Sequence, residues 1–144
     1  MERSLKTLIV LFKAYQSIMD VVQESLRDCD INLNEFTALE ALYHKESLTT
    51  KELADHVLIP NSSMTYVVAQ LEKKGYLVRQ QDHADKRIYR LALSESGKGQ
   101  FASIYQMHEA YVRPVFDVLH QQEEEQLQEL LKRIGKTAER KSKR

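Results

Sequence analysis

The chain has 144 residues, of which 42% are hydrophobic and 29% charged, and its formal net charge is zero. This length and composition suit one compact domain and exclude a disordered or fibrous chain, while the single cysteine excludes an internal disulfide framework. The longest uncharged apolar run, residues 7–12, is too short to span a bilayer, and no signal-peptide pattern follows Met1, so we expect a cytoplasmic protein with no membrane partner.

The first predicted helix covers residues 5–27. Its apolar residues recur in steps of three and four, which is the seam of a helix packed lengthwise on other helices: Leu5, Leu8, Phe12, Tyr15, Met19, Val22 and Leu26. Leu11, Ile18 and Val21 add a second apolar edge. A helix with two apolar edges contacts two surfaces, and this suits a subunit interface.

Three shorter helices are predicted next. The first runs over residues 34–44 with Asn34 as its N-cap. The second runs over residues 50–57, where Thr49 and Glu52 have the spacing of a capping box. The third begins at Pro60 and runs to residue 74, because proline suits a first helical turn and Gly75 suits the left-handed position after a helix.

Residues 76–81 and 87–93 then alternate with the period of strands, separated by the polar turn 82–86. Ser94 can cap a fifth helix, in which Gly97 and Gly99 should weaken the first turns and Pro114 should introduce a kink or a break. A last helix is predicted over residues 122–137, followed by a frayed basic tail, residues 140–144.

These elements predict a mainly α fold with a small β-hairpin wing. We expect a single domain over residues 1–144 with two lobes. Residues 32–94 form a winged helix-turn-helix lobe, and residues 1–31 and 95–144 form a helical dimerisation lobe.

The zero net charge argues against a nucleic-acid partner, but its distribution argues for one. Residues 60–90 carry six basic side chains against three acidic ones, whereas residues 20–55 carry three basic against nine acidic. Positive charge is therefore concentrated in the third helix of this group and in the hairpin.

On a helical projection of residues 60–74, one face is apolar and the other is small, hydroxyl-bearing and aromatic. A helix that lies in the major groove needs a face of this kind, because Ser and Thr can bond base edges or phosphates. The alternative is an ordinary solvated surface, but such a surface is usually charged, and residues 59–70 have no charge. The candidate DNA-binding residues on this helix are Asn61, Ser62, Ser63, Thr65, Tyr66 and Lys73.

Asp85, Lys86 and Arg87 supply the candidate DNA contacts of the hairpin turn. An arginine at a hairpin tip can enter a narrow minor groove, where the potential is most negative. Asp85 can hold the guanidinium through a pair of two oxygens and two nitrogens. The alternative is a simple surface salt bridge, which contributes roughly 0–1 kcal/mol.

Several segments together resemble the MarR (multiple antibiotic resistance regulator) family: residues 48–54 (LTTKELA), 60–65 (PNSSMT), 71–79 (LEKKGYLVR), 82–87 (DHADKR) and 91–97 (LALSESG). The resemblance covers nearly the whole chain. It implies a homodimer that binds a pseudopalindromic operator in double-stranded DNA, usually as a repressor. It also places the recognition-helix contacts on Ser62, Ser63, Thr65 and Tyr66, and the wing pair on Asp85 and Arg87. The N-terminal half is most similar to family members that respond to phenols and quinones.

The resemblance implies that a signal acts where the two lobes meet. We expect a small phenolic or quinone-like effector in a cleft between the first, second and fifth helices. Tyr15, Met19, Phe36 and Tyr111 are the candidate ligand-binding residues, with plain core packing as the alternative for each.

The other sensing chemistries have weaker support. A thiol-based redox response would have to use Cys29, but the adjacent Asp28 and Asp30 raise the pKa of a thiol and make it less reactive. The five histidines are scattered without helical i, i+4 pairs, so we expect no metal site and no cofactor. His108 falls on an apolar side and suits a buried, satisfied histidine.

The sequence also bears on two other function classes. An enzyme is not expected, since the sequence has no glycine-rich phosphate loop, nucleophile elbow or HExxH motif. A winged-helix module that binds proteins instead of DNA remains the alternative, because of the neutral net charge.

Overall fold

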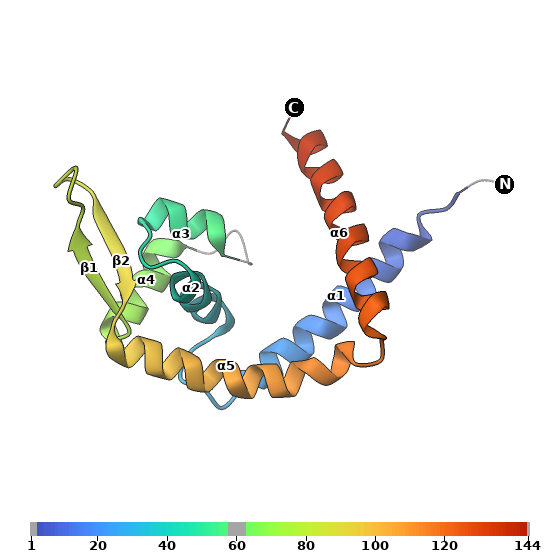
Figure 1. The fold of residues 1–144 in the computed structure, drawn as a ribbon, viewed down its shortest axis with the longest axis horizontal. Coiled ribbons are helices and arrows are strands. Elements are labelled where there is room, and N and C mark those ends of the chain that lie inside the picture. The colour runs from blue at the N-terminus through green and yellow to red at the C-terminus, as the bar shows by residue number, and fades with distance from the viewer. Residues whose placement is uncertain (1–2, 58–62, 144) are drawn as a thin grey trace.

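The computed structural model describes residues 3–57 and 63–143. In these ranges the chain forms six helices and two strands: α1 (Lys6–Ser25), α2 (Leu33–His44), α3 (Thr50–His56), α4 (Met64–Lys73), β1 (Leu77–Gln81), β2 (Tyr89–Leu93), α5 (Glu95–Phe116) and α6 (Gln121–Ser142). In Figure 1, α2, α3, α4 and the hairpin gather at one end of α5, while α1 and α6 extend from its other end. The mainly α fold with a hairpin wing is therefore confirmed.

The helix α2 is capped two residues earlier than the sequence predicts. Asn32 is its N-cap: its side-chain oxygen accepts from the Glu35 backbone N at 2.8 Å, and its own backbone N donates to Glu35 Oε1 at 2.9 Å. Asn34 lies inside the first turn, so its prediction as the cap was wrong. A reciprocal capping box satisfies two of the free N–H groups at once, which favours Asn32. The predicted box of Thr49 and Glu52 on α3 is confirmed.

The helix α4 begins at Met64, because Ser63 has extended backbone. The sequence predicts that this helix starts at Pro60, but Ser63 is not helical. Residues 60–62 lie outside the described residues. Its predicted end is confirmed: Gly75 has a φ of +81°, and the backbone N of Tyr76 donates to the Leu71 carbonyl at 3.0 Å. This is the Schellman arrangement that glycine allows without strain.

β1 and β2 pair antiparallel, from Leu77 opposite Leu93 to Gln81 opposite Tyr89. The connecting loop spans residues 82–88, so Arg87 and Ile88 belong to the turn and not to the second strand as expected. Asp82 Oδ2 shapes this turn by accepting from the backbone N of Ala84 and of Asp85, both at 3.0 Å.

Two features of the long helix α5 bear on its prediction. It continues through Pro114 without the predicted break and ends two residues later, at Phe116. Gly97 is not a weak point but a required one, because a Cβ atom there would overlap the Tyr76 carbonyl oxygen. The Ser94 cap is confirmed, since its hydroxyl accepts from the Gly97 backbone N at 2.9 Å.

The basic tail is helical as far as Ser142, so the prediction of fraying from residue 140 was wrong. Glu139 and Lys143 lie one turn apart and form an ion pair at 2.7 Å. Such a Glu-to-Lys pair favours a helix, and lysine near a helix C-terminus complements the dipole. In the described ranges, no helix is both long enough and apolar enough to cross a membrane.

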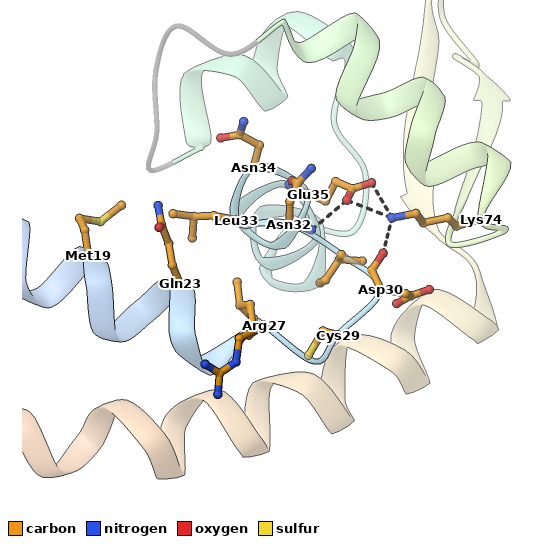
Figure 2. A pocket seen from close by; sticks show the side chains of 12 residues that line it. Met19, Gln23, Arg27, Cys29, Asp30, Asn32, Leu33, Asn34, Glu35 and Lys74 are labelled. Carbon is orange, nitrogen blue, oxygen red and sulfur yellow. Dashed lines mark hydrogen bonds and ion pairs between the residues drawn. The ribbon is translucent and has the colours of Figure 1, made fainter.

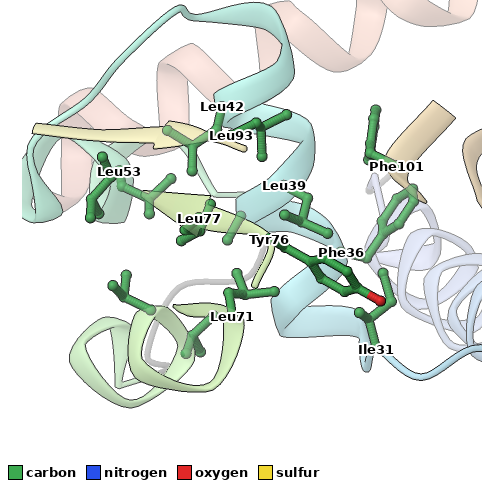
Figure 3. Packing of buried hydrophobic residues seen from close by; sticks show 14 of the residues in the cluster. Ile31, Phe36, Leu39, Leu42, Leu53, Leu71, Tyr76, Leu77, Leu93 and Phe101 are labelled. Atoms are coloured by element: carbon green, nitrogen blue, oxygen red, sulfur yellow. The ribbon is translucent and has the colours of Figure 1, made fainter. Parts of the chain in front are cut away.

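The hydrophobic core lies where α2, α3, α4, the hairpin and the first half of α5 meet (Figure 3). Leu39, Leu53, Leu71 and Leu91 are fully buried there. Phe101 brings α5 into the core by stacking on Phe36, with ring centroids 5.6 Å apart. Neither α1 nor α6 contains a buried residue in the single chain.

Candidate functional site

The two faces of α4 are the ones that the sequence predicts. Met64, Val67, Val68 and Leu71 are buried against the core. The candidate DNA-binding residues Ser63, Thr65, Tyr66 and Lys73 are exposed, with Tyr66 63% exposed. Asn61 and Ser62, the remaining candidates of this helix, lie outside the described residues. The outer face of α4 is therefore free to meet a partner.

In the turn of the hairpin, the carboxylate of Asp85 holds the exposed side chain of Arg87. Asp85 Oδ1 accepts from Arg87 Nε at 3.1 Å and Oδ2 accepts from its Nη2 at 2.9 Å. The Arg87 side chain is nevertheless 90% exposed. Its hydrogen bonds lower the pKa of Asp85, so the carboxylate stays charged. The predicted two-oxygen, two-nitrogen pair is present, and Lys86 beside it is also exposed.

Arg90 ties the hairpin to the segment before α3. Its Nε donates to Ser47 Oγ at 2.8 Å and its Nη2 donates to the Ser47 carbonyl at 3.0 Å. The same guanidinium lies 3.4 Å from Glu52 Oε1 and 3.9 Å from Asp82 Oδ1. The sequence analysis counted Arg90 only as a charge. Its partner Ser47 is 43 residues away, so no local pattern indicated an anchoring role.

The basic excess of residues 60–90 is smaller at the surface than in the sequence. Arg79 forms a two-point ion pair with Glu72, with both N–O distances 2.9 Å. Lys74 and Arg90 are also engaged with carboxylates. Among the described residues, Lys73 and Lys86 are the basic side chains of this segment with no recorded ion pair. The positive charge at the surface is thus focused on the end of α4 and on the wing.

A buried acid near the start of α2 joins the end of α4 to the loop after α1 (Figure 2). Lys74 Nζ donates to both carboxylate oxygens of Glu35 at 3.0 Å, and also to the Asp30 carbonyl. Tyr76 donates its hydroxyl to Asp30 Oδ2 at 2.7 Å. Burial and this hydrogen bond raise the pKa of Tyr76 to about 12. The sequence analysis missed this network, whose members are up to 46 residues apart.

A small pocket of about 230 Å³ lies between α1, α2 and α5. Three of the four candidate ligand-binding residues line it: Tyr15, Met19 and Phe36. Tyr111 does not line it, and donates its hydroxyl to Glu24 Oε2 at 2.8 Å instead. The sequence analysis missed the polar residues of the pocket, Glu40 and His108 among them.

Cys29 lies in a larger open groove of about 830 Å³ beside this pocket (Figure 2). Burial raises the pKa of its thiol, and Asp30 and Asp28 raise it further. A raised pKa leaves less of the reactive thiolate at neutral pH. The chain has no second cysteine with which Cys29 could form an internal disulfide.

Comparison with known proteins identifies the relatives of this chain. The model of the MarR family matches residues 31–89, which run from the end of the α1–α2 loop into β2. The chain is 37% identical over 137 residues to the HTH-type transcriptional regulator MhqR of Bacillus subtilis, covering 95% of this chain and 94% of MhqR. The chain belongs to the MarR family.

A second relative, YkoM of Bacillus subtilis, is 31% identical to this MarR protein over 134 residues. The match covers 93% of this chain and 87% of YkoM. Solved structures share the fold. BpsR of Bordetella bronchiseptica, described with regulation of its DNA binding by 6-hydroxynicotinic acid, has a TM-score of 0.77 and 21% identity over 88% of this chain and 90% of BpsR. NadR in complex with 4-hydroxyphenylacetate has a TM-score of 0.74 and 23% identity, and the match covers 92% of this chain and 93% of the NadR chain.

Membership of the MarR family gives the general activity of this protein. It is a DNA-binding transcription regulator with a winged helix-turn-helix. In a helix-turn-helix, the second helix of the motif is the one that enters the major groove.

Proposed function

We propose that this MarR protein is a homodimeric repressor, not an enzyme, that binds a pseudopalindromic operator in the cytoplasm. In this proposal α4 lies in the major groove and the wing reaches the adjacent minor groove. Asn61, Ser62, Ser63, Thr65, Tyr66 and Lys73 contact DNA from α4, and Asp85, Lys86 and Arg87 from the wing. The observation that carries the proposal is Arg87, which is held by Asp85 yet is 90% exposed.

The exposed pair of Asp85 and Arg87 contributes little to folding, because solvent screens it. Its carboxylate instead fixes the direction of a long side chain before any partner binds. A side chain fixed in advance loses less conformational entropy on binding. This is what a minor-groove arginine needs, and it favours a role in DNA binding over a role in stability.

The dimer is supported by apolar surface on the two terminal helices. Large apolar side chains of α1, of its N-cap Leu5 and of α6 are at least one third exposed in the single chain: Leu5, Leu8, Ile9, Val10, Leu11, Phe12, Leu127, Leu130, Leu131 and Ile134. Contiguous apolar surface on a monomer marks an interaction site. Because α1 and α6 extend from the same end of α5 (Figure 1), both can meet one partner copy.

The effector is proposed to be a small phenolic or quinone-like molecule, bound between α1, α2 and α5, that releases the protein from DNA. The pocket lined by Tyr15, Met19 and Phe36 supports this. The small molecules named with BpsR and NadR are also hydroxylated aromatic compounds. Tyr111 stays a candidate contact at the α1–α5 side of the cleft, through its position opposite Glu24.

Selection of bound fragments from a random double-stranded DNA pool tests the core of this proposal. The selected sites should be inverted repeats whose half-sites are centred about 10–10.5 base pairs apart. Affinity for such a site should fall steeply with salt, because phosphate contacts release counterions. A pool that shows no enrichment, or yields only direct repeats, contradicts binding by a two-fold symmetric dimer.

A further inference from the structure

The outer half of the hairpin has few ties to the rest of the molecule. Its turn lies at the end of the strands that is farther from α5 (Figure 1). In the described part of the chain, no recorded hydrogen bond or ion pair joins residues 80–89 to an element outside the hairpin. A two-stranded hairpin by itself is only marginally stable in water. The direction of the turn therefore depends on the nearest anchored positions of β2, which are Arg90 and Leu91.

Leu91 holds β2 through its backbone, by two hydrogen bonds with Leu48 on the segment between α2 and α3. Arg90 holds it through its side chain. Nε donates to Ser47 Oγ at 2.8 Å, and Nη2 donates to the Ser47 carbonyl at 3.0 Å. Nη1 lies 3.4 Å from Glu52 Oε1 and 3.9 Å from Asp82 Oδ1. One planar side chain thus joins β2 to the segment before α3, to the first turn of α3 and to the turn of the hairpin.

Both carboxylates beside Arg90 also shape the elements on which they lie. Glu52 closes the capping box of α3, where its Oε1 accepts from the Thr49 backbone N at 3.0 Å. Asp82 Oδ2 accepts from two backbone N–H groups of the hairpin turn, one of which belongs to Asp85. Arg90 therefore connects the start of α3 to the residue that organises the turn.

The sequence of contacts ends at Arg87. Asp85, whose backbone N is held by Asp82, accepts from the Arg87 backbone N at 3.0 Å and from two nitrogens of its guanidinium. Consecutive contacts therefore run from Ser47 through Arg90, Asp82 and Asp85 to the side chain that is proposed to enter the minor groove. A group that is placed before binding loses less conformational entropy when it binds.

Arg90 has little capacity left for a partner of its own. Its three side-chain nitrogens already face four acceptor atoms, and a guanidinium has five N–H groups in a fixed fork. The side chain is 31% exposed, against 90% for Arg87. These differences separate an arginine that holds the wing from one that is presented to a partner.

We propose that Arg90 is a positioning residue for DNA binding, which fixes the wing relative to the helix-turn-helix so that Arg87 and α4 reach neighbouring grooves of one operator together. The inference rests on the proposed wing contact and adds the residue that directs it. Arg90 acts through Arg87 and makes no DNA contact itself.

A double-variant cycle of operator affinity tests this role in the full-length protein. The probe is a fluorescently labelled duplex that carries the inverted repeat selected from the random DNA pool. Arg90→Met keeps a long side chain and removes the guanidinium. It should weaken binding about fivefold in otherwise wild-type protein but less than about twofold in Arg87→Ala protein, because the two residues act as one unit. Equal losses in the two backgrounds overturn the proposal.

Arg79→Met is the matched control within the hairpin. Arg79 lies on β1 and forms its two-point ion pair with Glu72 on α4, not with the turn. Its effect on affinity should agree within about twofold with and without Arg87. A cycle with Arg79 that is as non-additive as the cycle with Arg90 would indicate general damage to the hairpin, and would contradict a specific role of Arg90.

The salt dependence of binding separates positioning from a direct phosphate contact. Each neutralised phosphate contributes about 0.9 to the slope of log affinity against log salt concentration. In the Arg87→Ala background, Arg90→Met should leave this slope unchanged. A slope that is smaller by about one would show that Arg90 itself binds a phosphate, and would overturn the positioning role.

A measurement without DNA keeps this inference distinct from the proposed function. The backbone N–H groups of Asp82 and Ile88 are hydrogen-bonded within the turn, at 2.8 and 3.0 Å. Their hydrogen exchange should be about tenfold faster in Arg90→Met than in wild type or in Arg79→Met, because the turn opens more often. Unchanged exchange in Arg90→Met overturns the inference alone, even if the operator is bound as proposed. Operator affinity that Arg87→Ala leaves unchanged contradicts the proposed wing contact itself.

Discussion

Lys74 Nζ lies 3.0 Å from Glu35 Oε2, so the residue that caps the end of α4 is ion-paired to the first turn of α2. The Glu35 side chain is 4% exposed, and its carboxylate also accepts from the Asn32 backbone N. The next residue, Phe36, lines the proposed effector pocket. A displacement of this turn by a ligand would therefore act on the ion pair that positions the proposed recognition helix.

We expect Lys74→Met to destabilise the protein by about 2–3 kcal/mol, because it leaves a buried carboxylate without its cation. Lys73→Met is the matched control, since Lys73 is exposed and has no recorded ion pair among the described residues. Urea unfolding at a fixed protein concentration measures both. A loss that is equal for the two lysines contradicts the role of Lys74.

The contribution of the Glu35–Lys74 ion pair to the free energy of unfolding is measured by adding Glu35→Gln to Lys74→Met. Because the second change removes the charge that the first leaves unpaired, the double variant should lose about 1–2 kcal/mol less than the sum of the single variants. Strict additivity of the two losses would show that the ion pair contributes nothing beyond the separate side chains.

Two glycines of α5 should respond to alanine in opposite directions. Gly97→Ala places a methyl group against the Tyr76 carbonyl, where backbone on both sides leaves no room, and should destabilise the protein by more than about 1 kcal/mol. Gly99→Ala meets nothing within 4 Å and should stabilise it by about 0.5–1 kcal/mol through helix propensity. Thermal unfolding followed by circular dichroism compares the pair, and two shifts of the same sign contradict the close approach.

The same glycines show what sequence patterns predict and what they leave out. Local chemistry predicted the capping box of Thr49 and Glu52, the left-handed Gly75 and the two faces of α4, since each depends on residues within one or two turns. Gly97 appeared only as a poor helix former, because glycine is required there by a contact with Tyr76, the residue before β1. The Asn32 box is equally local, but a second asparagine at position 34 obscured it.

Long-range pairs escaped the sequence analysis for a physical reason. Glu35 and Lys74 are 39 residues apart, and Ser25 and His108 are 83 apart, so no periodicity relates them. Periodicity indicates which side of a helix is buried, and the family resemblance implied the cleft in which Tyr15, Met19 and Phe36 were expected. It gives no tautomer and no partner, and the polar half of the pocket depends on both.

Arg87→Ala should weaken binding to an A·T-rich operator by about tenfold or more and lower the salt dependence by roughly one counterion. The thermal stability should stay unchanged, because the Arg87 side chain is almost fully exposed. Lys132→Ala is the matched control: it breaks another exposed ion pair, with Glu129 on α6, far from the wing. Fluorescence anisotropy over a range of salt concentrations measures both variants, and operator affinity equal to wild type in Arg87→Ala refutes the wing contact.

The lowered pKa of His108 predicts that the folded protein loses stability on mild acidification. Burial lowers the pKa of the folded-state ring, so below the unfolded histidine pKa of about 6.5 the unfolded chain binds the proton more readily than the folded protein. Stability contributed by the neutral ring is then present above about pH 6.5 and is lost as the pH falls. Ser25 from α1, Glu40 from α2 and Glu109 on α5 surround the ring.

His108→Phe separates this contribution from that of Glu40. Burial raises the pKa of Glu40, so its protonation increases the stability of the folded protein as the pH falls. Wild-type protein should lose more stability between about pH 7.5 and about pH 5.5 than His108→Phe does, because only the wild type must exclude a proton from a partly buried imidazole. Urea midpoints at the two pH values measure the difference. Parallel losses in both proteins would mean that His108 is protonated as easily when folded as when unfolded.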